Sequence, residues 1–129
     1  MKRTIVLLWS VVIISNFLFA QNTWNQKADY AGGVRTGSAG FSIGNKGYLG
    51  VGIDDFQFYH QDFWEWDQSL NVWTQKADFI GIGRTFGVAF SIGNKGYFGM
   101  GYTAFGCGCM NDFYEYDPTA DTWTPKASL

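Results

Sequence analysis

The stretch FSIGNKGY occupies residues 41–48, and the same eight letters return at residues 90–97. The repetition extends well beyond them, because DFWEWD at 62–67 returns as DFYEYD at 112–117. Identity over such a length indicates an internal duplication. Its period of about 50 residues is typical of repeat architectures, in which each repeat is one supersecondary unit.

Within one repeat the sequence predicts strands and no helix. In the first repeat we expect strands at about 37–43, 47–52, 62–67 and 72–75. The turn GNK at 44–46 tolerates the positive φ that hairpins often need. Alternation in the third strand places Phe63 and Glu65 on one face and Trp64 and Trp66 on the other. No segment after the first twenty residues shows a long apolar period of 3.6 residues. The sequence therefore predicts an all-β fold made of four-stranded antiparallel sheets.

The pattern resembles the kelch-repeat β-propeller family. The resemblance is carried by an arginine before the first strand, a glycine-rich second strand, an aromatic-Asp pair ending the third and a tryptophan in the fourth: Arg35 and Arg84, Gly50 and Gly99, Trp66-Asp67 and Tyr116-Asp117, Trp73 and Trp123. The usual Gly-Gly doublet is replaced here by Gly-x-Gly. The resemblance implies a partial kelch propeller over 21–129, with one blade at about 31–76 and a second at about 80–126.

Two blades are fewer than the roughly four to eight that close a propeller. We therefore expect either further blades in a longer protein or assembly from other copies of the chain. WNQKAD at 24–29 matches WTQKAD at 73–78, so we expect an orphan N-terminal outer strand around Trp24. The resemblance implies that such a strand can complete the last blade of a ring.

The chain opens with MKRTIVLLWSVVIISNFLFA. Lys2 and Arg3, a short apolar run and a small residue at Ala20 are the pattern of a signal peptide over 1–20. The apolar run is shorter than the roughly 20 residues that a membrane-spanning helix needs. We therefore expect cleavage after Ala20 and a secreted, periplasmic or cell-surface protein with no membrane span in the mature chain.

Charge and cysteine content narrow the chemistry. The chain has 11 acidic against 9 basic residues and no basic run, which argues against a nucleic-acid partner. Cys107 and Cys109 form C-x-C, and an exported chain favours oxidised thiols, so a disulfide between them is one reading. Residues two apart strain that geometry, although Gly108 between them helps, and the alternative is two loop cysteines whose pairing is structural or undecided. His60 is the only histidine. We expect no metal site, no cofactor and no catalytic residue in this segment.

The candidate binding residues follow from a contrast between the repeats. The strands are near copies, yet the loops IDDFQFYHQ at 53–61 and YTAFGCGCMN at 102–111 share almost nothing. Divergent loops on a duplicated scaffold are typical of loops that make specific contacts. The alternative is drift in unconstrained loops. The loop-face candidates are Asp54, Asp55, Phe56, Tyr59, His60 and Phe105, with Arg35 and Arg84 beside them. For the two arginines, structural hydrogen bonding is the stronger reading.

We therefore expect a non-catalytic binding module for a protein or carbohydrate ligand at the loop face. The rival is a sugar-active enzyme on the same fold, a galactose-oxidase-like copper oxidase or a sugar epimerase. One histidine cannot supply the Tyr/His copper set that the resemblance to such oxidases implies. Its catalytic residues would have to lie in other blades.

Overall fold

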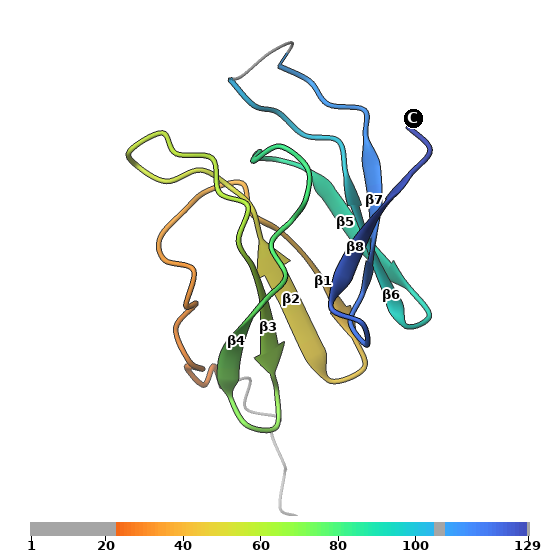
Figure 1. The fold of residues 1–129 in the computed structure, drawn as a ribbon. Coiled ribbons are helices and arrows are strands. Elements are labelled where there is room, and N and C mark those ends of the chain that lie inside the picture. The colour runs from red at the N-terminus through yellow and green to blue at the C-terminus, as the bar shows by residue number, and fades with distance from the viewer. Residues whose placement is uncertain (1–22, 105–107, 129) are drawn as a thin grey trace, which may run out of the picture.

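The computed structural model describes residues 23–104 and 108–128, and this part of the chain folds into β-strands without a helix (Figure 1). The strands are β1 Ala39–Ile43, β2 Lys46–Gly50, β3 Phe63–Asp67, β4 Val72–Lys76, β5 Val88–Ile92, β6 Lys95–Gly99, β7 Phe113–Asp117 and β8 Thr122–Lys126. They form two antiparallel sheets in the orders β1-β2-β3-β4 and β5-β6-β7-β8. The predicted all-β class and the two four-stranded sheets are confirmed.

The duplication extends to the pairing register. Phe41 lies opposite Tyr48 in the first sheet, and Phe90 lies opposite Tyr97 in the second. β1 begins two residues later than expected. The Thr36 backbone pairs instead with Ile53 of the same repeat, and Gly37 bonds to the connection that leads to the second sheet. The Phe86 amide donates to the Gly37 carbonyl at 2.9 Å.

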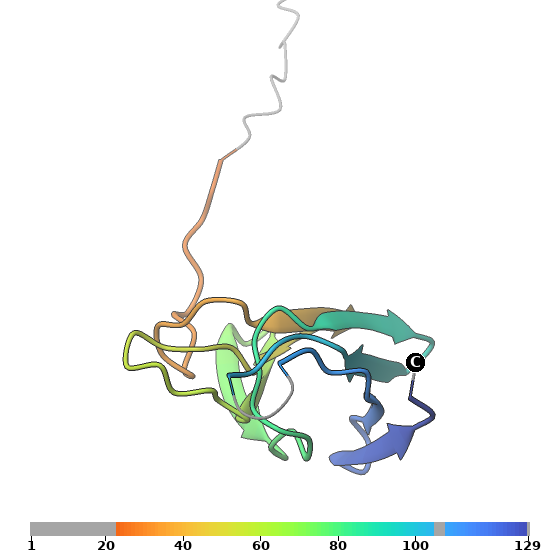
Figure 2. The same ribbon diagram turned by 90° about the horizontal axis from the view of Figure 1, so that it is seen from above.

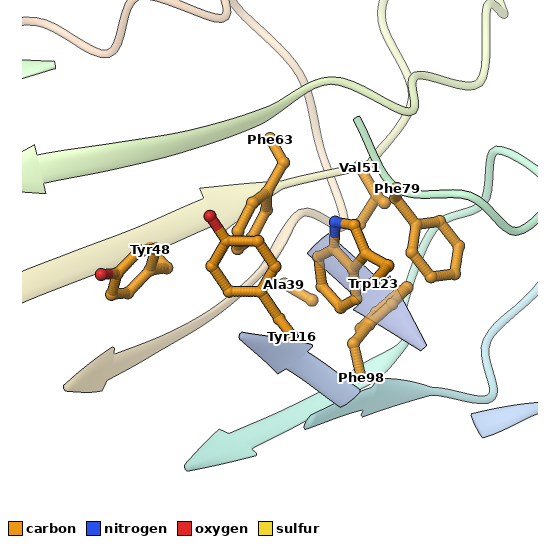
Figure 3. Close-up of a cluster of buried hydrophobic side chains, with 8 residues drawn as sticks. All are labelled: Ala39, Tyr48, Val51, Phe63, Phe79, Phe98, Tyr116 and Trp123. Carbon is orange, nitrogen blue, oxygen red and sulfur yellow. The ribbon is translucent and has the colours of Figure 1, made fainter. Parts of the chain in front are cut away.

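The two sheets lie side by side, with β1 next to β5 (Figure 2). Aromatic rings fill the space between them (Figure 3), and the buried core consists of Ala39, Tyr48, Val51, Phe63, Phe79, Phe98, Tyr116 and Trp123. Phe63 projects from the first sheet so that its ring centroid lies 4.9 Å from those of both Tyr116 and Trp123. Its alternation with Trp64 follows the predicted pattern. The apolar face of β3 thus contributes to the aromatic core that holds the two sheets together.

The connection between the sheets contributes one buried ring, that of Phe79, and two hydrogen bonds that involve Ala77. Phe79 is 1% exposed, and its ring lies 4.8 Å from Phe98 and 5.3 Å from Trp123. The Trp123 Nε1–H donates to the Ala77 carbonyl at 3.1 Å, and the Ala77 amide donates to the Asp121 carboxylate at 3.0 Å. The chain leaving the first sheet is therefore fixed to the outer strand of the second.

Asp67 and Asp117 act as the turn residues that the sequence predicted. The Asp67 carboxylate accepts from the amides of Ser69 and Leu70, and the Asp117 carboxylate accepts from that of Thr119. Lys46, opposite Asp67 on the neighbouring strand β2, donates to the Asp67 carboxylate at 2.6 Å. These contacts fix the two tight turns at the end of each sheet opposite the long loops (Figure 1).

The expected outer strand around Trp24 is not present. The segment 23–29 pairs with no strand, and the Trp24 side chain is fully exposed. The physical reason is a lack of partners, because β3 and β7 already pair with β4 and β8. The segment is held instead through Ala28, whose carbonyl accepts from Trp73 Nε1 at 3.1 Å.

Candidate functional site

The long loops and the connection between the sheets lie at one end of the molecule, and the short turns lie at the other (Figure 1). The first end carries the loop 53–61, the connection 77–87 and the loop that begins at Tyr102. We call it the loop end.

The two divergent loops are built on one backbone frame. Ile53 bridges to Tyr59 in the first loop, and Tyr102 bridges to Cys109 in the second. The amide of the residue after each bridge also crosses its loop: Asp54 donates to the Phe58 carbonyl, and Thr103 donates to the Gly108 carbonyl. The frame is therefore common to both repeats, and only its side chains differ.

Asp54 organises the first loop from within. One carboxylate oxygen accepts from the amides of Phe56 and Phe58 at 2.9 and 3.0 Å, and the other lies 3.1 Å from His60 Nε2. The bond from the Phe58 amide, helped by His60, holds the pKa of the Asp54 carboxyl below its ordinary value. Both Asp54 and His60 are thus occupied in shaping the loop.

A groove runs between this loop and the connection to the second sheet. Its lining residues are Phe58, Tyr59, Gln61, Ile80, Gly81, Ile82 and Gly83. Its volume is about 390 Å³, within the range of small-molecule and peptide-side-chain pockets. The lining contains rings, aliphatic side chains, one amide and backbone, and no charged side chain.

Two features of the connection keep the groove in place. The Gln61 amide nitrogen donates to the carbonyls of Phe79 and Gly81 at 3.2 and 2.6 Å, so it ties the loop to the connection. A Cβ on Gly83 would lie 2.4 Å from the Tyr59 carbonyl oxygen, so glycine is what allows this close approach. The groove floor is therefore rigid and mostly backbone.

The structure separates the predicted loop-face candidates into three positions. Asp55 and Phe56 lie exposed at the tip of the first loop, and Phe56 is 91% exposed. Tyr59 lines the groove. Phe105 and Cys107 lie outside the described residues, so the disulfide reading stays a prediction, and Cys109 is exposed. The loop residues come together at one end, but only Tyr59 reaches the groove.

Arg35 and Arg84 do not reach the loop surface. The Arg84 side chain is fully buried and pairs through both terminal nitrogens with the Asp112 carboxylate, while donating to the Met100 carbonyl. Arg35 pairs in the same way with Asp62, and its side chain is 2% exposed. The guanidinium of Arg84 is the main cause that lowers the pKa of Asp112. These buried pairs tie each first strand to the start of the third, so they are not available to a ligand.

Three groove residues were missed by the sequence reasoning, namely Phe58, Ile80 and Ile82. All three are more than half exposed although apolar. Their signal in the sequence was present: FQF at 56–58 and IGIG at 80–83 alternate apolar residues with polar or glycine residues outside any strand. Exposed apolar side chains that gather in a hollow mark interaction sites more often than isolated ones do.

Among the described residues, no group of three or more His, Cys, Asp or Glu side chains is placed to hold a metal ion. Within the same residues, no helix is long and apolar enough to cross a membrane.

Comparison with known proteins identifies the fold alone. No family model matches the chain, and no curated protein matches it. A solved structure entitled "Structure of YjhT" is similar, with a TM-score of 0.58 and 21% sequence identity over 71% of this chain. The match covers 27% of that chain, so this chain spans about a quarter of the length of its solved neighbour.

Proposed function

We propose that this chain forms two blades of a kelch-type β-propeller and acts as a non-catalytic binding module, exported from the cell, whose loop end binds a protein or glycan. The propeller architecture is supported by two sheets of equal topology with their first strands adjacent, and by the likeness in fold to the longer solved chain. Export is supported by the basic and apolar leader sequence at 1–20.

The groove between the loop 53–61 and the connection 80–83 is the observation that carries the binding function. It is preformed, because Gln61 and Gly83 fix its two walls at close range. Phe58 and Ile82 remain more than half exposed beside it, which gives a ligand apolar area without disturbing the core. Its lining lacks charge, so we expect it to take an apolar side chain of a peptide or the apolar face of a sugar.

The test is a binding screen with paired variants. The purified chain is applied to a glycan array and to an array of extracellular protein fragments, and the strongest binder is titrated. Phe58→Ala with Ile82→Ser should weaken that binding by at least about tenfold, the cost of losing one anchoring side chain. The melting temperature should stay nearly unchanged because both side chains are mostly exposed.

The matched control is Asn45→Ala, at the opposite end of the sheet, where the side-chain amide donates to the Ser69 hydroxyl at 3.1 Å. Loss of binding in this control, with the groove variant intact, would place the working surface at the turn end and contradict the proposal. Oxidation or epimerisation of a sugar by the chain would favour the sugar-active enzyme instead.

A further inference from the structure

The outward face of the second sheet repeats a face that is buried on the first. We call it the open face; its residues are Val88, Phe90, Ile92, Tyr97, Met100 and Phe113. Phe90 stacks on Tyr97 at 5.4 Å, and Tyr97 stacks on Phe113 at 5.8 Å. On the first sheet, the same layer of three rings packs against the second sheet. On the open face of the second sheet, Phe90 is 39% and Ile92 is 64% exposed.

The outward face of the first sheet repeats the surface that receives such a layer. We call it the receiving face; its residues are Tyr30, Leu49, Trp64, Trp66 and Trp73, which correspond to Phe79, Phe98, Tyr114, Tyr116 and Trp123. Tyr30 meets Trp73 edge-on at 5.0 Å, as Phe79 meets Trp123 at 5.3 Å. Beside Tyr30 and Leu49 lies a hollow of about 540 Å³.

We propose that copies of this chain associate head to tail, with the open face of one copy packed on the receiving face of the next. The two faces are the unused halves of an interface that the chain already forms between its own sheets. Such a contact joins two different surfaces, so it closes into a ring or continues as a filament.

The sizes of the facing side chains favour a second copy. Between the sheets of one chain, small Ala39 and Val51 face large Phe98 around one shared cavity. Between copies, Val88 and Met100 stand at the positions of Ala39 and Val51, and Leu49 stands at that of Phe98. Larger residues on the open face thus meet a smaller residue on the receiving face, so side-chain volume is conserved at these three positions. Trp64 and Trp66 are larger than Tyr114 and Tyr116, whose positions they occupy on the receiving face.

Two side chains at the loop end fit less well. Val34 stands where the internal interface has Gly83, and a Cβ added at Gly83 would lie 2.4 Å from the Tyr59 carbonyl oxygen in the loop of the neighbouring repeat. Phe86, with φ 57°, stands where the internal interface has Gly37, and a Cβ added at Gly37 would lie 1.7 Å from Thr85 Oγ1. The association is therefore weaker than the internal packing, and removing these two side chains should strengthen it.

The number of copies follows if the propeller architecture proposed above holds. Each copy brings two sheets, and propellers close with roughly four to eight, so a ring would contain about two to four copies. Association itself does not depend on that architecture or on ligand binding at the groove. A monomeric chain that still binds its ligand would overturn this inference and leave the proposed function standing.

The test uses one variant on each face. Ile92→Arg places a charge on the open face, and Leu49→Arg places one on the receiving face. By sedimentation velocity, the wild-type chain should have a mass above that of one chain, and each variant alone should be monomeric. An equal mixture of the two variants should form a complex of two chains and no more, because the intact open face of Leu49→Arg fits the intact receiving face of Ile92→Arg.

The controls separate this contact from nonspecific apolar association. Phe56→Arg removes a ring that is 91% exposed at the loop tip and should leave the wild-type mass unchanged. Val34→Gly with Phe86→Gly should shift association to lower protein concentration. A monomeric wild type, a mixture of the two folded variants that stays monomeric, or weaker association of the double glycine variant would each overturn the proposal. Circular dichroism establishes that each variant is folded.

Discussion

Replacing Phe63 by alanine removes the ring that joins the two sheets. Phe63 is 4% exposed, and its ring centroid lies 4.9 Å from those of Tyr116 and Trp123 in the other sheet. Truncation of a buried phenylalanine to alanine costs about 3–5 kcal/mol, the lost transfer free energy plus the cavity. The rings around it come from two rigid sheets that cannot collapse without moving together, so we expect about 4 kcal/mol.

The duplication supplies a matched control. Phe113 occupies the same position in β7 and stacks on Tyr97 at 5.8 Å, as Phe63 stacks on Tyr48. Neither of the two described sheets packs over Phe113 as the second sheet packs over Phe63, so Phe113→Ala should cost only about 1–2 kcal/mol. Both variants truncate a phenylalanine to alanine, so they differ only in whether the lost ring packs against another sheet.

The assay is urea unfolding followed by tryptophan fluorescence, at a protein concentration where sedimentation finds single chains. Phe63→Ala should lower the free energy of unfolding by at least about 2 kcal/mol more than Phe113→Ala. Equal losses in the two variants would refute the reasoning, because Phe63 would then gain nothing from the second sheet. At concentrations where copies associate, the difference between the two losses in unfolding free energy should narrow, because the next copy then covers Phe113.

Other predictions concern the buried Arg84–Asp112 ion pair and the hydrogen bond from Trp123 to Ala77. Asp112→Asn leaves the buried Arg84 without its carboxylate and should cost about 3 kcal/mol at pH 7. The folded pKa of Asp112 is lowered, so the pair's contribution is complete above the unfolded value of about 4 and is lost as pH falls through the folded pKa. The gap between wild type and variant in chemical denaturation should therefore shrink in acid, and a gap independent of pH would contradict this. Trp123→Phe should cost about 1–2 kcal/mol through the lost bond to Ala77, while Trp73→Phe, whose bond reaches an exposed segment, should cost less in the same assay.

Much of the fold could be predicted because the same strand pattern occurs twice in the sequence. Alternation in DFWEWD separates Phe63 from Trp64 and so identifies the core face of β3. The turn roles of Asp67 and Asp117 followed from their place before a tight turn. The strand starts could not be predicted as well, because Thr36 pairs with Ile53 and the Gly37 carbonyl accepts from the Phe86 amide, and the local sequence pattern does not indicate either contact.

The outer strand expected around Trp24 shows the limit of repeat logic. The letters WNQKAD match a true strand, but a strand needs a partner edge, and the described strands offer none at that place. The match between the two stretches therefore predicted a strand, but a segment forms a strand only where a neighbouring strand is free to pair with it.

The divergence of the loops pointed to 53–61, which forms one wall of the groove, yet Asp54 and His60 are bonded to each other and shape that loop from within. The groove also depends on Ile80 and Ile82, in the connection between the sheets, and the sequence analysis did not select them. The connection approaches Gln61 through tertiary contacts between segments far apart in the sequence, and the local pattern does not indicate them.

The groove at the loop end is the proposed binding surface. Hydrogen–deuterium exchange with the strongest binder from the arrays locates the residues that the ligand covers. We predict slower exchange on binding in 53–61 and 79–84, with no change in the hairpin turns at 43–46 and 67–72. Protection confined to those turns, with the groove segments unchanged, would contradict the account.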